Sequence, residues 1–179
     1  ENTLALTFPV NIWDYLGWRD TFAKPEFADR QMAYVKRFTV RAVYAPQIVI
    51  DGRSQAAATQ PDKIERLLSD AGRAARDPPD MMFREDGRLL VGSGPTPKGG
   101  AEVWMVRYDP HAQEVEVTKG ENRGKIIAYR NVVQELVRLG AWSGKPKAYR
   151  LPPPGAEGLE TAILVQQTGG GRVLALLAD

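Results

Sequence analysis

Cysteine is absent from this sequence, and the absence removes several kinds of chemistry at once. The chain can form no disulfide, and it offers neither a thiolate nucleophile nor a sulfur ligand for a metal. Histidine is almost absent as well, since His111 is the only one among 179 residues. A zinc site usually takes several His or Cys ligands, so the sequence predicts no metal site and no bound cofactor.

A large net charge and a long apolar run are also lacking. The chain carries 24 Lys and Arg against 22 Asp and Glu, a formal net charge of +2, and the two signs are interspersed. This balance gives no electrostatic case for binding nucleic acid or an anionic membrane surface. No run of about 18 apolar residues is present, so no membrane-spanning helix is expected.

Proline and glycine are plentiful, with 13 and 17 residues that cluster in the second half of the chain. This clustering predicts short strands joined by tight turns. The first residues, "ENTLALTFPV", show neither a start methionine nor the charged-then-apolar pattern of a signal peptide. Glu1 is therefore expected to be an internal residue of a longer chain.

Hydrophobic periodicity in the first part of the chain predicts strands alternating with helices. The first expected elements are a buried strand at 3–13, an aromatic-rich loop and a helix at 25–38. A strand within 43–53 follows and ends in a turn at Asp51-Gly52. A small-residue connection at 54–60 then leads to a second helix, which begins at Pro61 and is capped by Thr59 or Gln60. The apolar faces of the two helices are expected to hold Phe27, Gln31, Tyr34, Val35 and Phe38, and Ile64, Leu67, Leu68, Ala71 and Ala75, respectively.

The sequence "RDPPD" (76–80) marks a boundary, because two consecutive prolines stop a helix and stiffen a linker. Beyond it the apolar residues alternate, which is typical of strands. The segment 131–140 fits both a helix ending at Gly140 and a strand, and the surrounding strands favour a strand. The strand predictions are 102–109, 113–119, 125–133, 147–151, 161–167 and 172–178, with turns at "DPHA" and "TGGG".

Three blocks of the sequence together resemble one family. They are "VNIWDYLGWRDTFAKPEFADRQMAYVKRF", "VYAPQIVIDGR" and "VTKGENRGKIIAYRNVVQELVRLGAWSG", and they cover most of the chain in the family's order and spacing. All three are similar to the secreted bacterial thioredoxin-like proteins known as domain of unknown function 1223. The chain departs from the family at Pro9 and Asn11, which replace a histidine and an aspartate, and at Ala45, which replaces a threonine.

The order of strand, helix, strand and helix, followed by roughly seven short strands, predicts a βαβ unit, a linker at 77–80 and a β-sandwich-like domain over 81–179. The resemblance implies that residues 1–76 form a thioredoxin-like domain, so the expected fold class is α/β plus all-β. It also implies that the family's first strand, its Cys-x-x-Cys motif and the following helix lie upstream of Glu1. That first strand is central in such a sheet, and buried unpaired backbone groups cost about 1–3 kcal/mol each. An upstream part of the protein, or another segment in its place, is therefore expected.

The resemblance also implies a binding site. The bond before Pro46 is expected to be cis, so that the backbone of Ala45 presents a free N–H and C=O to an extended peptide. The aromatic loop is expected to wall a cleft beside it. In the structural alternative, the indoles of this loop plug one end of the sheet and its aspartate caps a turn. The expected binding residues are Ala45, Pro46, Trp13, Asp14, Tyr15 and Trp18.

Two function classes follow from the resemblance. In the first, the protein is periplasmic or secreted, and this chain binds a protein or peptide partner without catalysis of its own. In the second, the complete protein is a thiol–disulfide oxidoreductase whose cysteines lie upstream. The first is preferred for this chain, because disulfide exchange needs an attacking thiolate and the sequence supplies none.

Overall fold

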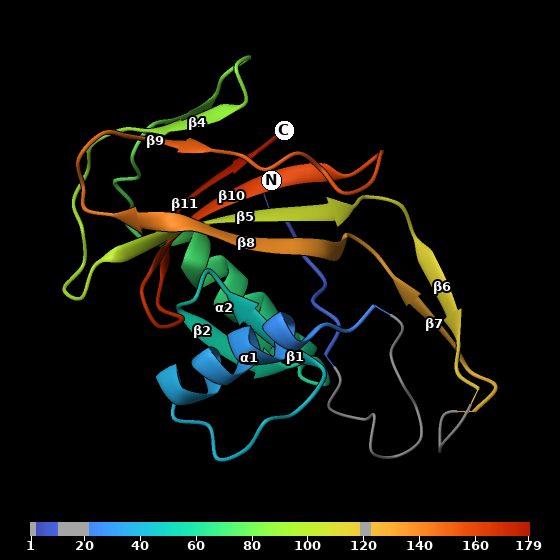
Figure 1. The fold of residues 1–179 in the computed structure, drawn as a ribbon. Coiled ribbons are helices and arrows are strands. Elements are labelled where there is room, and N and C mark those ends of the chain that lie inside the picture. Colours follow the sequence, from blue (N-terminus) through green and yellow to red (C-terminus); the bar gives the residue numbers. More distant parts are fainter. Residues whose placement is uncertain (1–2, 11–21, 119–122) are drawn as a thin grey trace.

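The structure, a computed structural model, describes residues 3–10, 22–118 and 123–179 (Figure 1). It is a mixed α/β fold in which every pair of named strands is antiparallel. The first part of the chain holds two helices and a hairpin between them. These elements are α1 (Pro25–Arg37), β1 (Gln47–Ile50), β2 (Ser54–Ala57) and α2 (Pro61–Arg73).

The rest of the described chain is built from strands. A four-stranded sheet has the order β11-β10-β5-β8, a three-stranded sheet has the order β3-β4-β9, and β6 and β7 form a separate hairpin that projects from the body (Figure 1). The strands are β3 (Met81–Phe83), β4 (Arg88–Val91), β5 (Ala101–Asp109), β6 (Gln113–Glu116), β7 (Ile126–Tyr129), β8 (Val132–Trp142), β9 (Lys147–Arg150), β10 (Glu160–Gln167) and β11 (Val173–Ala178).

The two larger sheets pack face to face across one hydrophobic cluster. Trp142 is fully buried there, together with Leu89 of β4 and Met105 of β5. The indole Nε1 of Trp142 donates to the carbonyl O of Gly92 at 3.1 Å, so the polar edge of this buried ring is satisfied. This arrangement has the two-layer form expected of a β sandwich.

The opposite face of the four-stranded sheet is covered by α1 and by residues 3–10. Phe27 of α1 is 1% exposed and packs with Val106 and Val133 of the sheet. The ring of Phe8 meets Phe27 edge-on, with centroids 5.6 Å apart. The first part of the chain therefore shares a core with the strands that follow.

The two helices differ in how well they match their predicted apolar faces. Both begin at a proline, which suits the first helical position because that residue needs no N–H partner. Phe27, Tyr34 and Val35 of α1 are buried as predicted. In α2 only Ala71 is buried, and Leu68 is 43% exposed, so the predicted burial of Leu68 is wrong. Gln60 is the N-cap of α2 but makes no side-chain cap bond.

Residues 3–10 do not form the predicted strand. Thr7 alone bridges to Val132, in parallel: its N–H donates to Asn131 O, and its C=O accepts from Val133 N. The next donor in a parallel ladder would be the N–H of residue 9, and Pro9 has none. The alternating apolar side chains still pack on the sheet, but the proline ends the pairing after one bridge.

Three other segments differ from the prediction. The connection 54–60 contains strand β2, which forms because its backbone pairs with β1. The predicted strand 125–133 is in fact β7, a turn and the start of β8. Strands β3 and β4 were not predicted. All of the ambiguous segment 131–140 except its first residue lies within strand β8, so the preference for a strand is confirmed.

The turn at Asp51-Gly52 brings the β1–β2 hairpin against the four-stranded sheet. Both residues have positive φ, 51° and 62°, which confirms the predicted turn. A Cβ on Gly52 would lie 2.0 Å from the carbonyl O of Gly171, so only glycine fits this close approach. The C=O of Asp51 also accepts from Val173 N at 2.8 Å.

Tyr108 allows a test of the packing beneath α1. Its side chain is buried, and its hydroxyl donates to Glu160 Oε2 at 2.8 Å. Burial, together with the Glu160 carboxylate, raises the pKa of the Tyr108 phenol to about 12. An unfolded tyrosine ionises near pH 10, so the contribution of Tyr108 to stability is complete below about pH 10 and is lost as pH rises through the folded pKa.

Tyr108→Phe should therefore lower the free energy of unfolding by about 1 kcal/mol at neutral pH, because a buried hydrogen bond is removed. It should also reduce the loss of stability between about pH 10 and 12. Urea unfolding across this pH range, followed by circular dichroism, measures both effects. If the free energy of unfolding of the variant falls as much between about pH 10 and 12 as that of the wild type, another group causes the loss of stability.

Candidate functional site

The loop between α1 and β1 brings polar groups to one place. The Ala45–Pro46 bond is cis, as the resemblance implied. Ala45 is partly buried, Pro46 is exposed, and both immediately precede β1. The C=O of Pro46 accepts from the N–H of Ala58 at 3.1 Å, which extends the β1–β2 ladder by one bond.

Four side chains form a hydrogen-bonded network beside this loop, which we call the amide cluster. Gln31 Nε2 of α1 donates to Tyr44 O at 2.7 Å and to Gln47 Oε1 at 3.2 Å. Gln55 Oε1 of β2 accepts from the Tyr44 hydroxyl and, at 3.2 Å, from Gln47 Nε2. The cluster ties α1 to the Tyr44–Ala45 backbone and to both strands of the hairpin.

Several hydrogen-bonding groups at this loop are unused. No described residue pairs with the backbone N–H or C=O of Ala45, and the same holds for Gln31 Oε1 and Gln55 Nε2. Within the described ranges, β1 has one strand partner, β2, so its other edge is open. An extended chain lying beside Ala45 would find one backbone donor and one backbone acceptor, which are the groups that a strand edge offers.

The amide cluster is electrically neutral. It consists of glutamine amides and a tyrosine hydroxyl and includes no carboxylate, histidine or cation. Such groups can hold and orient a polar chain by hydrogen bonds. The chemistry available from the cluster itself is therefore recognition rather than acid–base or nucleophilic catalysis.

The structure brings together only part of the predicted site. Ala45 and Pro46 lie at the amide cluster, whereas Trp13, Asp14, Tyr15 and Trp18 fall outside the described residues. Sequence reasoning missed the glutamines of the cluster. One signal was present, because Gln31 falls on the otherwise apolar face predicted for the first helix, and a polar residue there needs a partner.

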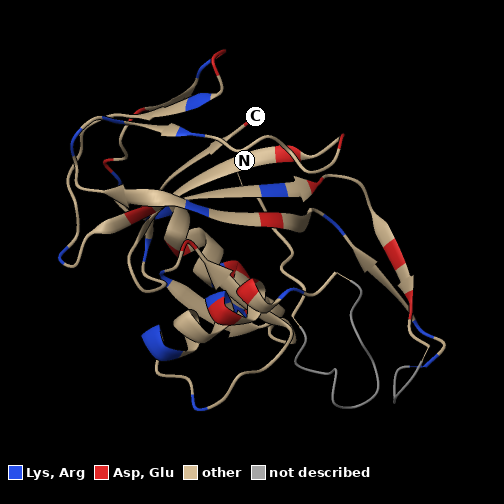
Figure 2. Ribbon diagram, in the orientation of Figure 1, with Lys and Arg blue, Asp and Glu red and all other residues tan. Residues whose placement is uncertain are grey.

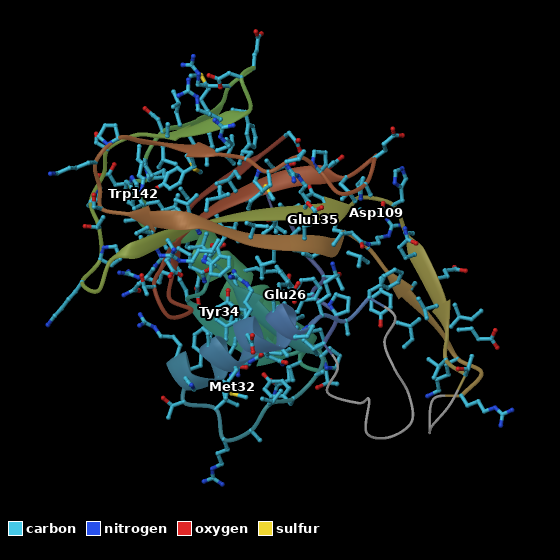
Figure 3. All side chains as sticks on the ribbon, viewed as in Figure 1. Glu26, Met32, Tyr34, Asp109, Glu135 and Trp142 are labelled. Carbon is cyan, nitrogen blue, oxygen red and sulfur yellow. The ribbon has the colours of Figure 1, made fainter. Side chains whose placement is uncertain are left out.

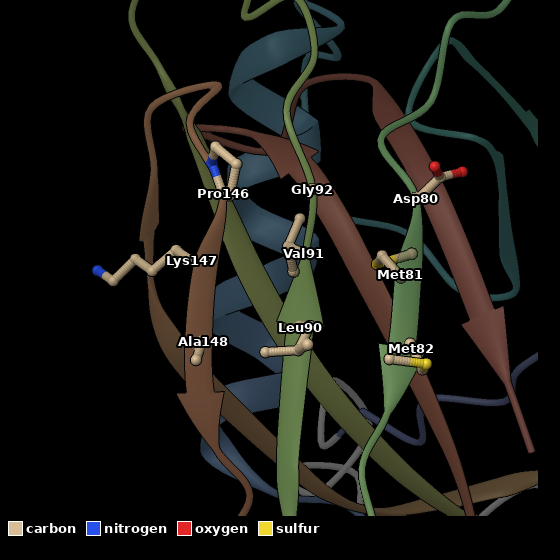
Figure 4. A pocket seen from close by; sticks show the side chains of 9 residues that line it. All are labelled: Asp80, Met81, Met82, Leu90, Val91, Gly92, Pro146, Lys147 and Ala148. Atoms are coloured by element: carbon tan, nitrogen blue, oxygen red, sulfur yellow. The ribbon is translucent and has the colours of Figure 1, made fainter.

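A separate hollow of about 650 Å³ lies on the outer face of the three-stranded sheet (Figure 4). Met82, Leu90 and Ala148 form an apolar row across its three strands, with Asp80 and Lys147 at its border. No titratable side chains converge there on a common point, and nothing among the described residues indicates what occupies it.

The described ranges offer little for a metal site or a membrane span. No group of three or more His, Asp or Glu is placed to hold a metal ion in those ranges. None of the helices that the structure describes is long and apolar enough to cross a bilayer. Basic and acidic residues are interspersed over the described helices and strands (Figure 2).

Comparisons with known proteins give one family and one similar fold. The model of a family described as "Protein of unknown function (DUF1223)" matches residues 1–166. No curated protein matches the chain. A crystal structure of an Agrobacterium tumefaciens protein, determined by a structural genomics consortium, is similar in fold, with a TM-score of 0.71 and 24% sequence identity. The match covers 97% of this chain and 78% of that one.

Proposed function

We propose that this chain, which belongs to the DUF1223 family of proteins of unknown function, binds an extended polypeptide segment at Ala45 and the amide cluster. The observation that carries this proposal is that no described residue pairs with the backbone N–H or C=O of Ala45, beside four side chains that are already hydrogen-bonded to one another. Preorganised groups lose little conformational freedom when a ligand binds.

Binding would use main-chain hydrogen bonds first and side-chain contacts second. A segment lying along Ala45 donates to its C=O and accepts from its N–H, as in β-augmentation. Gln31 Oε1 and Gln55 Nε2 then offer one acceptor and one donor to polar groups of the segment. Because the cluster is neutral, its affinity should depend little on salt.

The finer fold assignment forms part of the proposal. Residues 1–76 would belong to a thioredoxin-like domain, residues 77–80 would be its linker and residues 81–179 would be the β-sandwich-like domain. The open edge of β1 supports this, because the resemblance implies a central strand at that position. Trp13, Asp14, Tyr15 and Trp18 would wall the cleft beside Ala45, and the protein would act in the periplasm or outside the cell.

Recognition is proposed in preference to thiol–disulfide exchange. Exchange begins with attack by a thiolate, and this chain contains no cysteine. An insulin-reduction assay on the complete protein separates the two functions, because a chain without cysteine gives no turnover under either of them. Turnover that is lost when upstream cysteines are replaced by serine would favour the oxidoreductase, and an absence of turnover would favour recognition.

A peptide titration tests the proposed site. The probe is a fluorescein-labelled hexapeptide of alternating serine and valine, followed by fluorescence anisotropy. Gln31→Leu should weaken binding about tenfold, because it removes Gln31 Oε1 and releases the Tyr44 carbonyl that the side chain holds. The matched control is Gln60→Leu, which changes an exposed glutamine without a side-chain cap bond.

The proposal predicts that the control variant binds like the wild type. A probe with its alternate backbone amides N-methylated should bind at least about tenfold more weakly, because it cannot donate to Ala45. Equal binding of the methylated and unmethylated probes would contradict main-chain recognition at this loop. The melting temperature of each variant confirms that the fold is intact.

A further inference from the structure

Strand β8 forms the outer edge of the four-stranded sheet, and most of this edge is open. Among the described residues, the bridge from Thr7 to Val132 is the only backbone pairing on its outer side. Pro9 ends that pairing because it has no N–H. From Gln134 onward, the backbone groups of β8 that do not point toward β5 have no strand partner in the described ranges.

A hollow of about 300 Å³ lies along this open edge. It is lined by the consecutive β8 residues 134–137, by Lys24 and Glu26 at the start of α1, and by Pro152 and Pro153 after β9. Figure 3 labels Glu26 and Glu135, which come from the two elements that meet there.

The hollow extends over both faces of the sheet at its edge. Successive strand residues point to opposite faces, and here Leu136 packs with the cluster under α1 while Val137 packs with the cluster between the sheets. The lysine and glutamate thus border one face, and the prolines border the other. A single extended chain in the plane of the sheet has the shape that fills such a space.

The existing contacts show how the edge is satisfied without a ligand. Lys24 Nζ donates to the carbonyl O of Gln134, in place of the N–H that an added strand would supply. Glu135 is fully engaged, because it pairs with Arg107 at 3.1 Å and accepts from Gly155 N at 2.7 Å. The carboxylate of Glu26 has no ion-pair partner among the described residues and remains available for a cation.

We infer that the β8 edge from Gln134 to Val137 is a second strand-docking site, which takes an extended segment of a partner polypeptide. A basic side chain of that segment faces Glu26, and an apolar side chain lies on Pro152 and Pro153. A second copy of this chain fits less well. In a second copy, the same lysine, glutamate and two prolines flank the β8 edge. Two edges that are both flanked in this way cannot approach each other to the strand spacing of about 4.8 Å.

Fluorescence anisotropy with a labelled hexapeptide of alternating lysine and valine tests this site. Glu26→Gln should weaken binding about threefold at low salt, since one ion pair is lost. Lys24→Ala should strengthen binding about threefold, because the peptide no longer displaces an ammonium from Gln134 O. The matched controls on the same helix are Asp29→Asn and Lys36→Ala, both at exposed positions.

Each remaining outcome decides for or against this site. The controls should bind like the wild type, and alternate N-methylation of the probe should weaken binding about tenfold. Weaker binding by Lys24→Ala would show that the peptide does not replace the lysine at Gln134 O, and equal binding of the methylated and unmethylated probes would show that the peptide does not pair with the strand. Either result overturns the inference. If light scattering shows a wild-type dimer that the peptide dissociates, the occupant is a second copy of this chain, and the inference is overturned as well.

Gln31→Leu should leave the binding of the lysine–valine peptide unchanged, which separates the β8 site from the site at Ala45.

Discussion

Phe27→Ala is expected to lower the free energy of unfolding by about 3–5 kcal/mol. The Phe27 ring is 1% exposed, and it joins α1 to strands β5, β8 and β10 in one cluster. Its removal leaves a cavity between helix and sheet, and rigid strands on one side limit how far the site can collapse. Urea unfolding followed by both tryptophan fluorescence and circular dichroism measures the change.

The matched control is Met32→Ala on the same helix. Met32 is 42% exposed (Figure 3), so its truncation should change the free energy of unfolding by less than about 1 kcal/mol. Both probes should report a single transition for Phe27→Ala, because the helix and the sheet share their core. If the helical signal is lost while the strands stay folded, residues 1–76 unfold as an independent unit, and the shared core does not couple the unfolding of the helix to that of the sheet.

Glu135→Ala should have an effect of similar size, about 3–5 kcal/mol. Its carboxylate pairs with Arg107, whose side chain is 6% exposed, and Arg107 also donates to Pro152 O. Without Glu135, a buried guanidinium keeps its charge but loses its counter-charge, and Gly155 N loses its acceptor. The double variant Arg107→Met, Glu135→Leu should recover much of the lost stability, since no unpaired charge remains.

An exposed pair on the same two strands provides the comparison. Arg138 Nε of β8 lies 3.0 Å from Glu102 Oε1 of β5, and the Arg138 side chain is 48% exposed. Solvent screens this pair, so Arg138→Ala should cost no more than about 1 kcal/mol. If the double variant is no more stable than Glu135→Ala, the cost arises from lost packing rather than from the buried charge.

The elements with clear periodicity could be predicted from sequence. Strands β5, β10 and β11 carry apolar runs of strand length, and β10 is buried over five consecutive residues, while α1 presents its apolar face at helical spacing after Pro25. Strands β3 and β4 were missed because three or four residues carry little periodicity. A turn signal was nevertheless present in Asp86-Gly87, between two apolar runs, and Gly87 has a φ of 79°.

Long-range pairing could not be read from local patterns. Residues 3–10 alternate as a strand does, but their pairing depends on which edge they meet and on Pro9 in the ladder. Likewise, β2 forms from a small-residue segment because β1 lies beside it. Propensity is a weak guide where a neighbouring strand supplies the hydrogen bonds.

The candidate site was only partly predictable for the same reason. Ala45 and Pro46 came from the family resemblance. The amide cluster draws Gln31 from α1, Gln47 from β1 and Gln55 from β2, and only the fold brings these residues together. Glutamines at such separate positions have no spacing that a sequence pattern could reveal.

The most direct test of the proposed function is the hydrogen exchange rate of the Ala45 amide, measured by NMR with and without the serine–valine hexapeptide. A bound segment that accepts from this N–H should slow its exchange about tenfold or more at saturation, and Gln31→Leu should reduce that protection at the same peptide concentration. Exchange at Ala45 that stays equally fast while the peptide is bound would contradict recognition at this backbone.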